Sequence, residues 1–338
     1  IMAILKVDTI SGIGTEGSVF EGDIEFTSQQ FLTLPKGDTT QRGRGRAVIS
    51  GGRSGHAMQF INIQSQGNSI TFGDSVTGDG VEGYATGSSV RGLFSGTHPS
   101  SDNVIEFITF ATQSNGTDFG DTTEGRRSGA GLGNDTRGIF CGGIKSNSAS
   151  TNIMDFVTFT TLGNATDFGD MTVGRDQLAG VNDTTRGCLC GGVVQPGSHN
   201  NTIDFITTAT TGNAQDFGDM ENGFAHSSGA SGKTRGLMAT GYSPNFNTNI
   251  NFITIQTTGN TKDFGDLLQA RSIGAGMSNT IRGVYAGGYN PSPSFTSFNI
   301  IDFVNIETTG NALDFGDLSL GANYVLQAAS DSHGGLSE

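Results

Sequence analysis

The sequence contains one tetrapeptide that suggests catalytic chemistry, DFGD, as at Asp167 to Asp170. In a phosphoryl-transfer enzyme, the aspartate of Asp-Phe-Gly holds a magnesium ion. Such an aspartate is needed once, but this motif or its variant ITFGD occurs six times, centred on Phe72, Phe119, Phe168, Phe217, Phe264 and Phe315. The sequence also lacks the Gly-rich loop, strand lysine and catalytic-loop segment of a kinase. The repetition therefore indicates a structural role for the motif.

The six copies are 47, 49, 49, 47 and 51 residues apart, and a period near 50 is typical of an array of one supersecondary unit. Each unit has four pieces, exemplified by a Gly/Ala-rich stretch (RSGAGLGND), an apolar run after Arg-Gly (RGIFCGG), an alternating run (IMDFVTFTT) and a TGN turn before DFGD. Short Val-, Ile-, Phe- and Thr-rich runs bounded by Gly and Asn predict strands. No long stretch has helical periodicity. We therefore expect four short strands in each unit.

The spacing inside the repeat separates rigid segments from one variable segment. From the third-strand Phe to the FGD Phe there are 12 residues in all six units, and from the FGD Phe to the next Arg-Gly there are 18 or 19. Between the end of the second strand and the third-strand Phe, the intervening counts are 7, 9, 12, 12, 10 and 14. Constant spacing is expected of packed strands, and the variable connection is expected to be an exposed loop.

Six four-stranded units predict an all-β protein, a six-bladed β-propeller over residues 45–332, with an extended arm at 1–44 and a tail at 333–338. The second strand is apolar on both faces, which suits the middle of a blade, and the Gly-rich first strand suits the crowded axis. The two repeated Phe positions hold twelve of the 23 phenylalanines and are expected in the core between blades. The strand within Leu318–Ser332 is expected to complete the first blade, since closure removes open sheet edges.

The repeat resembles the kelch repeat over about 46–332. A kelch unit has a di-glycine after its second strand, matched here by Gly142-Gly143, Gly191-Gly192 and Gly287-Gly288. The FGD Phe stands where kelch repeats usually carry Trp, and this chain contains no Trp. The di-glycine is also replaced in two units, by SGT at Ser95–Thr97 and by TGY at Thr240–Tyr242. The resemblance implies a propeller and leaves the function open, because propellers have many functions.

Two further features resemble proteins of tailed bacteriophages, particularly marine cyanophages. They are the opening AILKVDTI at Ala3–Ile10 and the GNATDFGDMTVGR type of repeat. The resemblance implies a non-enzymatic virion protein, assembled in the host cytoplasm, such as a tail fibre; a capsid or neck decoration protein is the closest alternative. So short a segment cannot form a core of its own, so the arm either packs on the propeller or docks on a partner by strand addition. The phage resemblance implies that it binds other virion proteins. Its apolar residues are Leu5, Val7, Ile10, Phe20, Phe26 and Phe31.

Composition excludes several classes of partner. The formal net charge is −14, from 32 acidic and 18 basic residues, which disfavours nucleic acid and anionic membranes. No apolar run is long enough to span a bilayer. Cys141, Cys188 and Cys190 lack a ligand motif and are expected to be small buried core thiols rather than zinc ligands, and the five histidines are scattered. We expect no cofactor, and association of several copies of the chain is left open.

The variable loops are the candidate binding surface, since they join the same two strands in every unit and are expected to emerge on one face. They are rich in Asn, Ser and Pro, with occasional aromatic residues, a composition that suits recognition of host-surface glycans or proteins, though tolerant surface loops would look the same. The candidate residues are His98, Ser100, Lys145, Asn147, Gln195, His199, Asn245, Phe246, Asn290 and Phe295.

Two sets of repeated polar residues are interpreted first as structural. Each unit has an Arg before its second strand and an Asp that ends FGD, and these are expected to form ion pairs or to cap turns. The alternative is that the aspartates bind cations, because hard cations prefer carboxylate oxygen. These aspartates are Asp74, Asp121, Asp170, Asp219, Asp266 and Asp317.

An enzyme that acts on glycans is the alternative of another class. It would need carboxylates placed asymmetrically near the axis. The first strands supply mainly Gly, Ala and Ser, with Glu82, Asp176 and His226 as exceptions. In the aligned repeats these three residues are expected at different heights, which argues against a catalytic group.

Overall fold

The computed structural model describes residues 44–337, except 53–54, 77–81, 97–101, 240, 243–244, 273, 292–293 and 322–325. All of these residues belong to the second of two units into which the chain divides, Thr39–Glu338. The predicted arm lies outside the described residues except for Arg44, and so do its residues Leu5, Val7, Ile10, Phe20, Phe26 and Phe31. The loop residues His98 and Ser100 also lie outside them.

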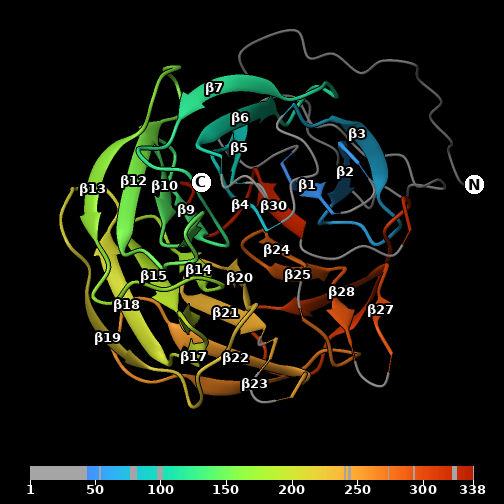
Figure 1. The fold of residues 1–338 in the computed structure, drawn as a ribbon. Coiled ribbons are helices and arrows are strands. Elements are labelled where there is room, and N and C mark those ends of the chain that lie inside the picture. The colour runs from blue at the N-terminus through green and yellow to red at the C-terminus, as the bar shows by residue number, and fades with distance from the viewer. Residues whose placement is uncertain are drawn as a thin grey trace, which may run out of the picture. The chain divides into compact units, whose positions relative to one another are not determined.

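The described residues form six four-stranded antiparallel sheets arranged around a centre, which confirms the predicted six-bladed β-propeller (Figure 1). We number the blades 1 to 6 from the sheet that contains β1. The innermost, first strands of blades 1 to 6 are β30 (Leu326–Ser330), β4 (Tyr84–Gly87), β9 (Ala130–Gly133), β14 (Ala179–Asn182), β20 (Ser228–Ser231) and β24 (Ala275–Ser278). The second strands are β1 (Arg46–Gly51), β5 (Arg91–Ser95), β10 (Arg137–Cys141), β15 (Arg186–Cys190), β21 (Arg235–Ala239) and β25 (Arg282–Ala286).

The outer half of each blade consists of the third and fourth strands. The third strands are β2 (Ala57–Asn62), β6 (Val104–Thr109), β12 (Ile153–Thr158), β18 (Thr202–Thr207), β22 (Asn249–Thr254) and β28 (Ile300–Asn305). The fourth strands carry the FGD motif and are β3 (Ile70–Asp74), β7 (Thr117–Asp121), β13 (Thr166–Asp170), β19 (Gln215–Asp219), β23 (Lys262–Asp266) and β29 (Leu313–Asp317).

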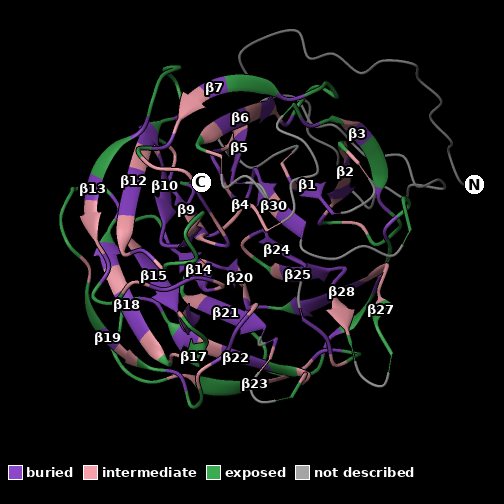
Figure 2. Cartoon of the chain, in the orientation of Figure 1, coloured by how far each residue is buried: buried purple, intermediate pink, exposed green. Residues whose placement is uncertain are grey.

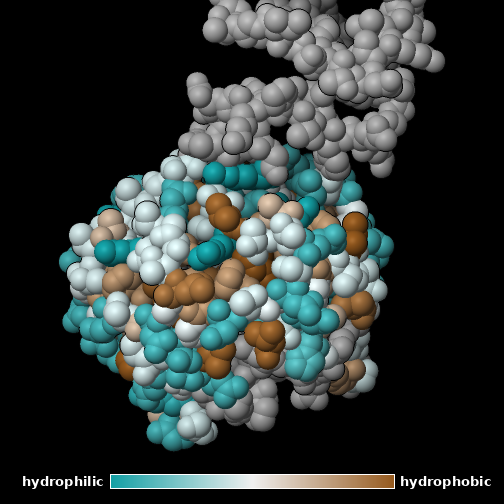
Figure 3. All heavy atoms as spheres, turned by 90° about the horizontal axis from the view of Figure 1, so that it is seen from above, coloured by the Kyte–Doolittle hydropathy of each residue, from teal (hydrophilic) through white to brown (hydrophobic). Residues whose placement is uncertain are grey.

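Burial falls from the middle strands to the rim, as Figure 2 shows for the outer strands β7, β13, β19 and β23. Every second strand is buried after its first residue, as expected for a strand packed on both faces. Each FGD Phe is 2–3% exposed and lies 5.9–6.2 Å from the third-strand Phe of its own blade, edge to face. On the side of the molecule seen in Figure 3, apolar residues lie in separate patches among polar ones.

The C-terminal strand completes the first blade, as predicted from the sequence. Strand β30 pairs antiparallel with β1, with Ala47 opposite Ser330 and Gly51 opposite Leu326. The Asp331 carboxylate then accepts hydrogen bonds from the backbone N–H groups of Gly45 (2.7 Å) and Arg46 (3.0 Å). The two ends of the propeller are thereby joined within one sheet.

Three short strand pairs lie outside the blades and were not predicted. One strand of each pair starts directly after the di-glycine. The pairs are β11 (Ile144–Lys145) with β8 (Arg126–Arg127), β16 (Val193–Val194) with β17 (Ser198–His199), and β26 (Tyr289–Asn290) with β27 (Thr296–Ser297). The second glycine has φ of +105° to +110° at Gly143, Gly192 and Gly288. An added Cβ there would lie 1.9–2.6 Å from a carbonyl oxygen of the connection that leads into the same blade. Only glycine fits this close approach.

Candidate functional site

The first strands of the blades surround a central cavity of about 140 Å³. It lies at the end of the propeller axis where these strands begin. We call this cavity the funnel. A smaller cavity of about 70 Å³ lies further along the same strands and is lined partly by His333. There the C-terminal segment crosses the axis: His333 Nε2 donates to the Gly87 carbonyl (2.8 Å), and the Gly334 N–H donates to the Ser231 carbonyl (2.9 Å). The segment therefore obstructs the axial channel beyond the funnel.

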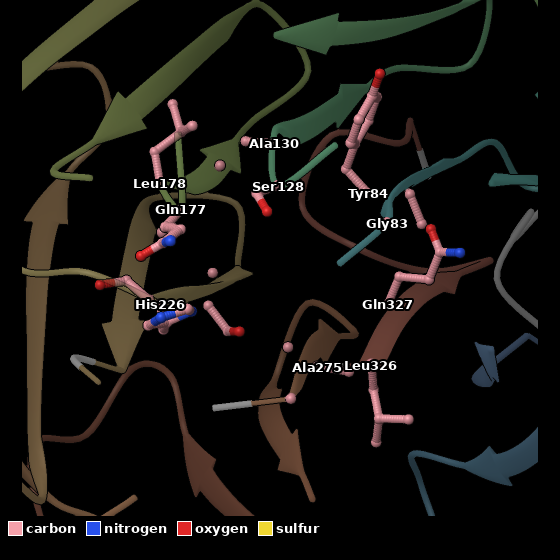
Figure 4. Close-up of a pocket in the computed structure, with 18 of the residues that line it drawn as sticks. Gly83, Tyr84, Ser128, Ala130, Gln177, Leu178, His226, Ala275, Leu326 and Gln327 are labelled. Carbon is pink, nitrogen blue, oxygen red and sulfur yellow. The ribbon is translucent and has the colours of Figure 1, made fainter. Parts of the chain in front are cut away.

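Four polar residues at equivalent positions line the funnel where the chain enters blades 2 to 5. They are Glu82, Ser128, Gln177 and His226, and we call them the collar. Their φ angles are 61°, 58°, 58° and 54°, which is the left-handed region that non-glycine residues rarely adopt. Ser128, Gln177 and His226 lie around one opening, whereas Tyr84 points away from it (Figure 4). The collar side chains thus approach the axis from four successive blades.

Glu82 is the charged member of the collar, and its charge is matched by a neighbour. Its carboxylate accepts a hydrogen bond from Arg127 Nε at 2.7 Å and another from the Ser128 hydroxyl at 3.3 Å. Burial lowers the pKa of His226, although the Glu82 charge acts in the opposite direction. The imidazole is therefore neutral at neutral pH and offers one donor and one acceptor.

Five aromatic side chains from the loops of blades 4 to 6 form a continuous contact chain, which we call the crescent. His199 and Tyr242 lie 5.4 Å apart, Tyr242 and Phe246 5.1 Å, Phe246 and Tyr289 5.7 Å, and Tyr289 and Phe295 5.3 Å between ring centroids. Tyr289 lines the funnel, and its ring is 6.2 Å from that of His226. Phe295, at the other end, is 56% exposed. The crescent therefore runs from the solvent to the funnel.

The structure brings together three of the predicted loop residues, His199, Phe246 and Phe295, and leaves the other described ones outside the crescent. Lys145 pairs with Glu124 (2.7 Å), Gln195 donates to the buried Asp176 (3.2 Å), and Asn290 donates to the Ala270 carbonyl (3.0 Å). Asn147 accepts a hydrogen bond within its own turn, and Asn245 is exposed.

The expectation that Glu82, Asp176 and His226 lie at different heights is wrong for two of them. Glu82 and His226 occupy equivalent positions, two residues before the Tyr84 and Ser228 that pair with the last residues of β5 and β21. Asp176 precedes the collar residue Gln177 and bridges to Val193. Its side chain is bound by Ser150 and Gln195, and burial raises its pKa. Both residues stand nine residues before the Arg of Arg-Gly, Arg91 and Arg235, so the spacing in the sequence was enough to show that they are equivalent.

Neither the collar as a set nor two members of the crescent, Tyr242 and Tyr289, were predicted from the sequence. Both tyrosines directly follow the second glycine position of the repeat, at Gly241 and Gly288. Equivalent positions hold Ile144 and Val193. The change from aliphatic to aromatic residues in blades 5 and 6 was the available signal. The residue types of the collar do not predict its left-handed backbone, except that Glu82 and Ser128 each precede a glycine.

The repeated arginines bind carbonyls and rings, so the expected ion pairs with the FGD aspartates are not found among the described residues. Each guanidinium lies 4.4–4.9 Å above the third-strand Phe of its own blade. In five blades it also donates to a backbone carbonyl of the next blade, as Arg186 does to Ile255 (3.1 Å). The described residues contain no group of three or more His, Cys, Asp or Glu side chains that could hold a metal ion.

The three cysteines are free and fully buried, and burial raises the pKa of all three thiols. They therefore lie in the core as uncharged thiols and not as reactive thiolates. In the part of the chain that the structure describes, no helix is long and apolar enough to cross a membrane.

Comparison with known proteins yields likeness in structure only. No protein-family model matches the sequence, and no curated protein matches it either. Among solved structures, that of YjhT superposes with a TM-score of 0.62 over 76% of this chain and 92% of the other, at 12% sequence identity. At this identity the likeness shows the propeller fold alone.

Proposed function

We propose that this protein is a non-enzymatic structural protein of a tailed-bacteriophage virion, an appendage such as a tail fibre that contacts the host surface. The proposal rests on the phage-like opening at Ala3–Ile10 and on the kelch-like repeat with its GNATDFGD turns. In this arrangement residues 1–44 attach the protein to other virion proteins, and the propeller presents its loop face outward. The alternative role is decoration of the capsid or neck, and the location of the protein on the virion distinguishes the two roles.

The crescent is the observation that supports a binding role. Its five aromatic residues come from the loops of three blades, although these loops vary in length and sequence. Phe295 is 56% exposed, and the other rings are half-buried. An aromatic ring offers a large rigid contact area at a low cost in conformational entropy. Such a surface suits stacking against the apolar face of a sugar ring, with the polar loop residues around it to bind hydroxyl groups.

Immunogold labelling of purified virions with antibody against the propeller tests the location. Label at the tail tip or fibres is the expected result, label on the capsid or neck would favour the decoration role, and absence of label would remove the virion assignment.

Deletion of residues 1–44 tests whether the arm anchors the protein to the particle. The truncated propeller should fold and fail to join particles, and its incorporation into particles would rule out anchoring through the arm.

Binding of the purified full chain to host cells tests the crescent. Phe295→Ala is expected to weaken binding, since it removes the most exposed ring of the crescent. The matched control is Val90→Ala, because Val90 is 57% exposed but lies in the turn after the first strand of blade 2, away from the crescent. Oxidation of the vicinal hydroxyls of surface glycans with periodate should abolish binding, whereas loss of binding on protease treatment alone would indicate a protein receptor.

A further inference from the structure

The funnel has the features of a small ligand site. The four described collar positions all hold polar residues and all have φ between 54° and 61°. Glycine would adopt this conformation without strain, yet the chain has Glu82, Ser128, Gln177 and His226 there. Strained positions of this kind persist only where the surrounding structure determines them, and they cluster at ligand sites. A single such residue also occurs outside the funnel, at Ser148 in the blade 3 loop, but four of them meet around this cavity.

The size and shape of the funnel limit what it can hold. Its volume of about 140 Å³ is well below the few hundred Å³ of a drug-sized pocket. Its walls are backbone and small side chains of the first strands, and the C-terminal segment obstructs the channel beyond it. The funnel therefore suits one small ring at the end of a larger molecule, entering from the side of the crescent.

The chemistry of the lining favours hydroxyl groups. A serine hydroxyl, a glutamine amide and a neutral imidazole each both donate and accept, as adjacent hydroxyls of a sugar do. The Glu82 carboxylate disfavours an anionic ligand, and its pairing with Arg127 at 2.7 Å removes the need for a cationic one. Tyr289, which lines the funnel beside His226, supplies an apolar wall for the C–H face of a ring.

We infer that the funnel binds a single neutral sugar residue, the terminal unit of a glycan whose following part lies along the crescent. Gln177, His226 and Ser128 bind its hydroxyl groups, and Tyr289 packs against its ring. This inference rests on the proposed host-surface role for the glycan as a whole. The terminal-sugar site itself depends only on the geometry of the funnel.

Substitution by glycine tests whether the collar side chains serve stability or ligand binding. Gln177→Gly and His226→Gly remove the side chain and relieve the left-handed strain, so each should raise Tm by about 2 °C. The matched control is Ser148→Gly, whose φ is 65° and which lies in the blade 3 loop outside both the funnel and the crescent. The control should gain similar stability and keep its binding.

Binding is measured on the full chain by saturation-transfer difference NMR with methyl glycosides of glucose, galactose, mannose, N-acetylglucosamine and glucuronic acid. We expect at least one neutral glycoside to bind and the glucuronide not to bind. Each collar variant should weaken binding by about tenfold, as expected for one lost neutral hydrogen bond. Absence of binding by every neutral glycoside, preference for the glucuronide, or unchanged affinity in both collar variants would overturn the inference.

The two proposals fail separately. If Phe295→Ala abolishes attachment to host cells while no glycoside enters the funnel, the terminal-sugar site is wrong and the host-binding role stands. If a neutral glycoside binds in a collar-dependent way but virions carry no label, the sugar site stands and the virion role is wrong.

Discussion

At the scale of single residues, the repeated arginine and phenylalanines form one unit in each blade. In blade 4, Arg186 lies 4.4 Å from the centroid of the Phe205 ring, which meets Phe217 edge to face at 6.2 Å. The same guanidinium donates to the Ile255 carbonyl in blade 5 at 3.1 Å. A planar cation is required for both contacts, because it stacks through its face and donates from its edge. The Arg-Gly motif therefore joins neighbouring blades.

Arg186→Ala should lower the free energy of unfolding by about 1–3 kcal/mol, from the lost cation–π contact and the lost hydrogen bond. Arg186→Lys should recover part of this loss, since it keeps the charge but not the planar fork. Urea denaturation of the three proteins measures the effect. Equal stability of all three would contradict a joining role for the guanidinium.

At the scale of elements, the FGD motif and the TGN turn form a latch between successive blades. The Gly212 N–H donates to the Phe168 carbonyl (2.7 Å), and the Ala214 N–H donates to the Asp170 carbonyl (2.8 Å). Asn213 Oδ1 accepts from the Asp170 N–H at 3.1 Å. Equivalent bonds from the backbone N–H of the FGD Asp to the turn Asn join every pair of neighbouring blades, including blade 6 to blade 1. This latch gives a structural reason why the motif recurs in every blade.

Gly169→Ala should disrupt the latch between blades 3 and 4. Gly169 has φ of +136°, and an added Cβ would lie 2.5 Å from the Gly212 carbonyl oxygen. The control is Gly212→Ala, which has a similarly strained φ of +156° but no atom within 4 Å of the added Cβ. Both should lose stability, and Gly169→Ala should lose at least about 2 kcal/mol more, because a backbone atom must move. Equal losses, measured by thermal unfolding, would show that the close approach is unimportant.

A second link between elements is a buried ion pair within a blade. It joins the segment that precedes the first strand to the third strand of the same blade. Arg175 and Asp204 lie 2.8 Å apart with both side chains 0% exposed, and blades 3 and 6 contain equivalent pairs. Blade 5 has Phe224 and Asn251 at the same two positions, both of them buried. In blade 5 the two charges are absent together, as expected when an unpaired buried charge is costly. In blade 2 the buried Glu106 accepts hydrogen bonds from the Ser75 hydroxyl and the Val76 N–H.

The neutral Phe–Asn pair of blade 5 can be introduced into blade 4 by mutation. Arg175→Met leaves the Asp204 carboxylate buried without its partner and should cost about 3–5 kcal/mol of stability. The double variant Arg175→Phe with Asp204→Asn reproduces the blade 5 pair and should recover most of this loss. Denaturant unfolding of the single and double variants gives the comparison. A double variant no more stable than the single one would show that blade 4 cannot accept the neutral pair.

At the scale of the whole molecule, the ring is held closed between the C-terminal strand and the start of β1. Asp331 accepts hydrogen bonds from two backbone N–H groups there, yet burial raises its pKa to about 6 in spite of them. The folded state therefore holds the proton more tightly than the unfolded chain does. Its free energy of unfolding falls as the pH rises from about 4 to about 6, and this contribution is constant above that range.

Asp331→Asn removes this titration and keeps an oxygen that can accept from the same N–H groups. The stability of the variant relative to the natural chain should rise by about 3 kcal/mol between pH 4 and pH 7. The other carboxylates titrate in both proteins and cancel in the difference. A difference in unfolding free energy that is independent of pH would show that the closing carboxylate titrates normally.

The sequence determined the propeller, the number of blades and the closing strand, because each rests on local repetition. A period near 50, a TGN turn and an apolar second strand recur with little variation, and a sixth first strand at the C-terminal end remained for blade 1. The variable connection was also located correctly, because rigid spacing on both sides isolates it. These features depend on residue type and spacing within one unit, which the sequence displays directly.

Only the tertiary structure decided which residues meet at the axis and on the loop face. His199, Phe246 and Phe295 are in three different loops, and their contact depends on how the blades are placed around the ring. Glu82 and His226 come from blades 2 and 5 and line the same funnel. The left-handed backbone of the collar follows from packing of the connection against its neighbours. Contacts between blades are long-range properties of the closed ring, so the pattern of a single repeat could not reveal them.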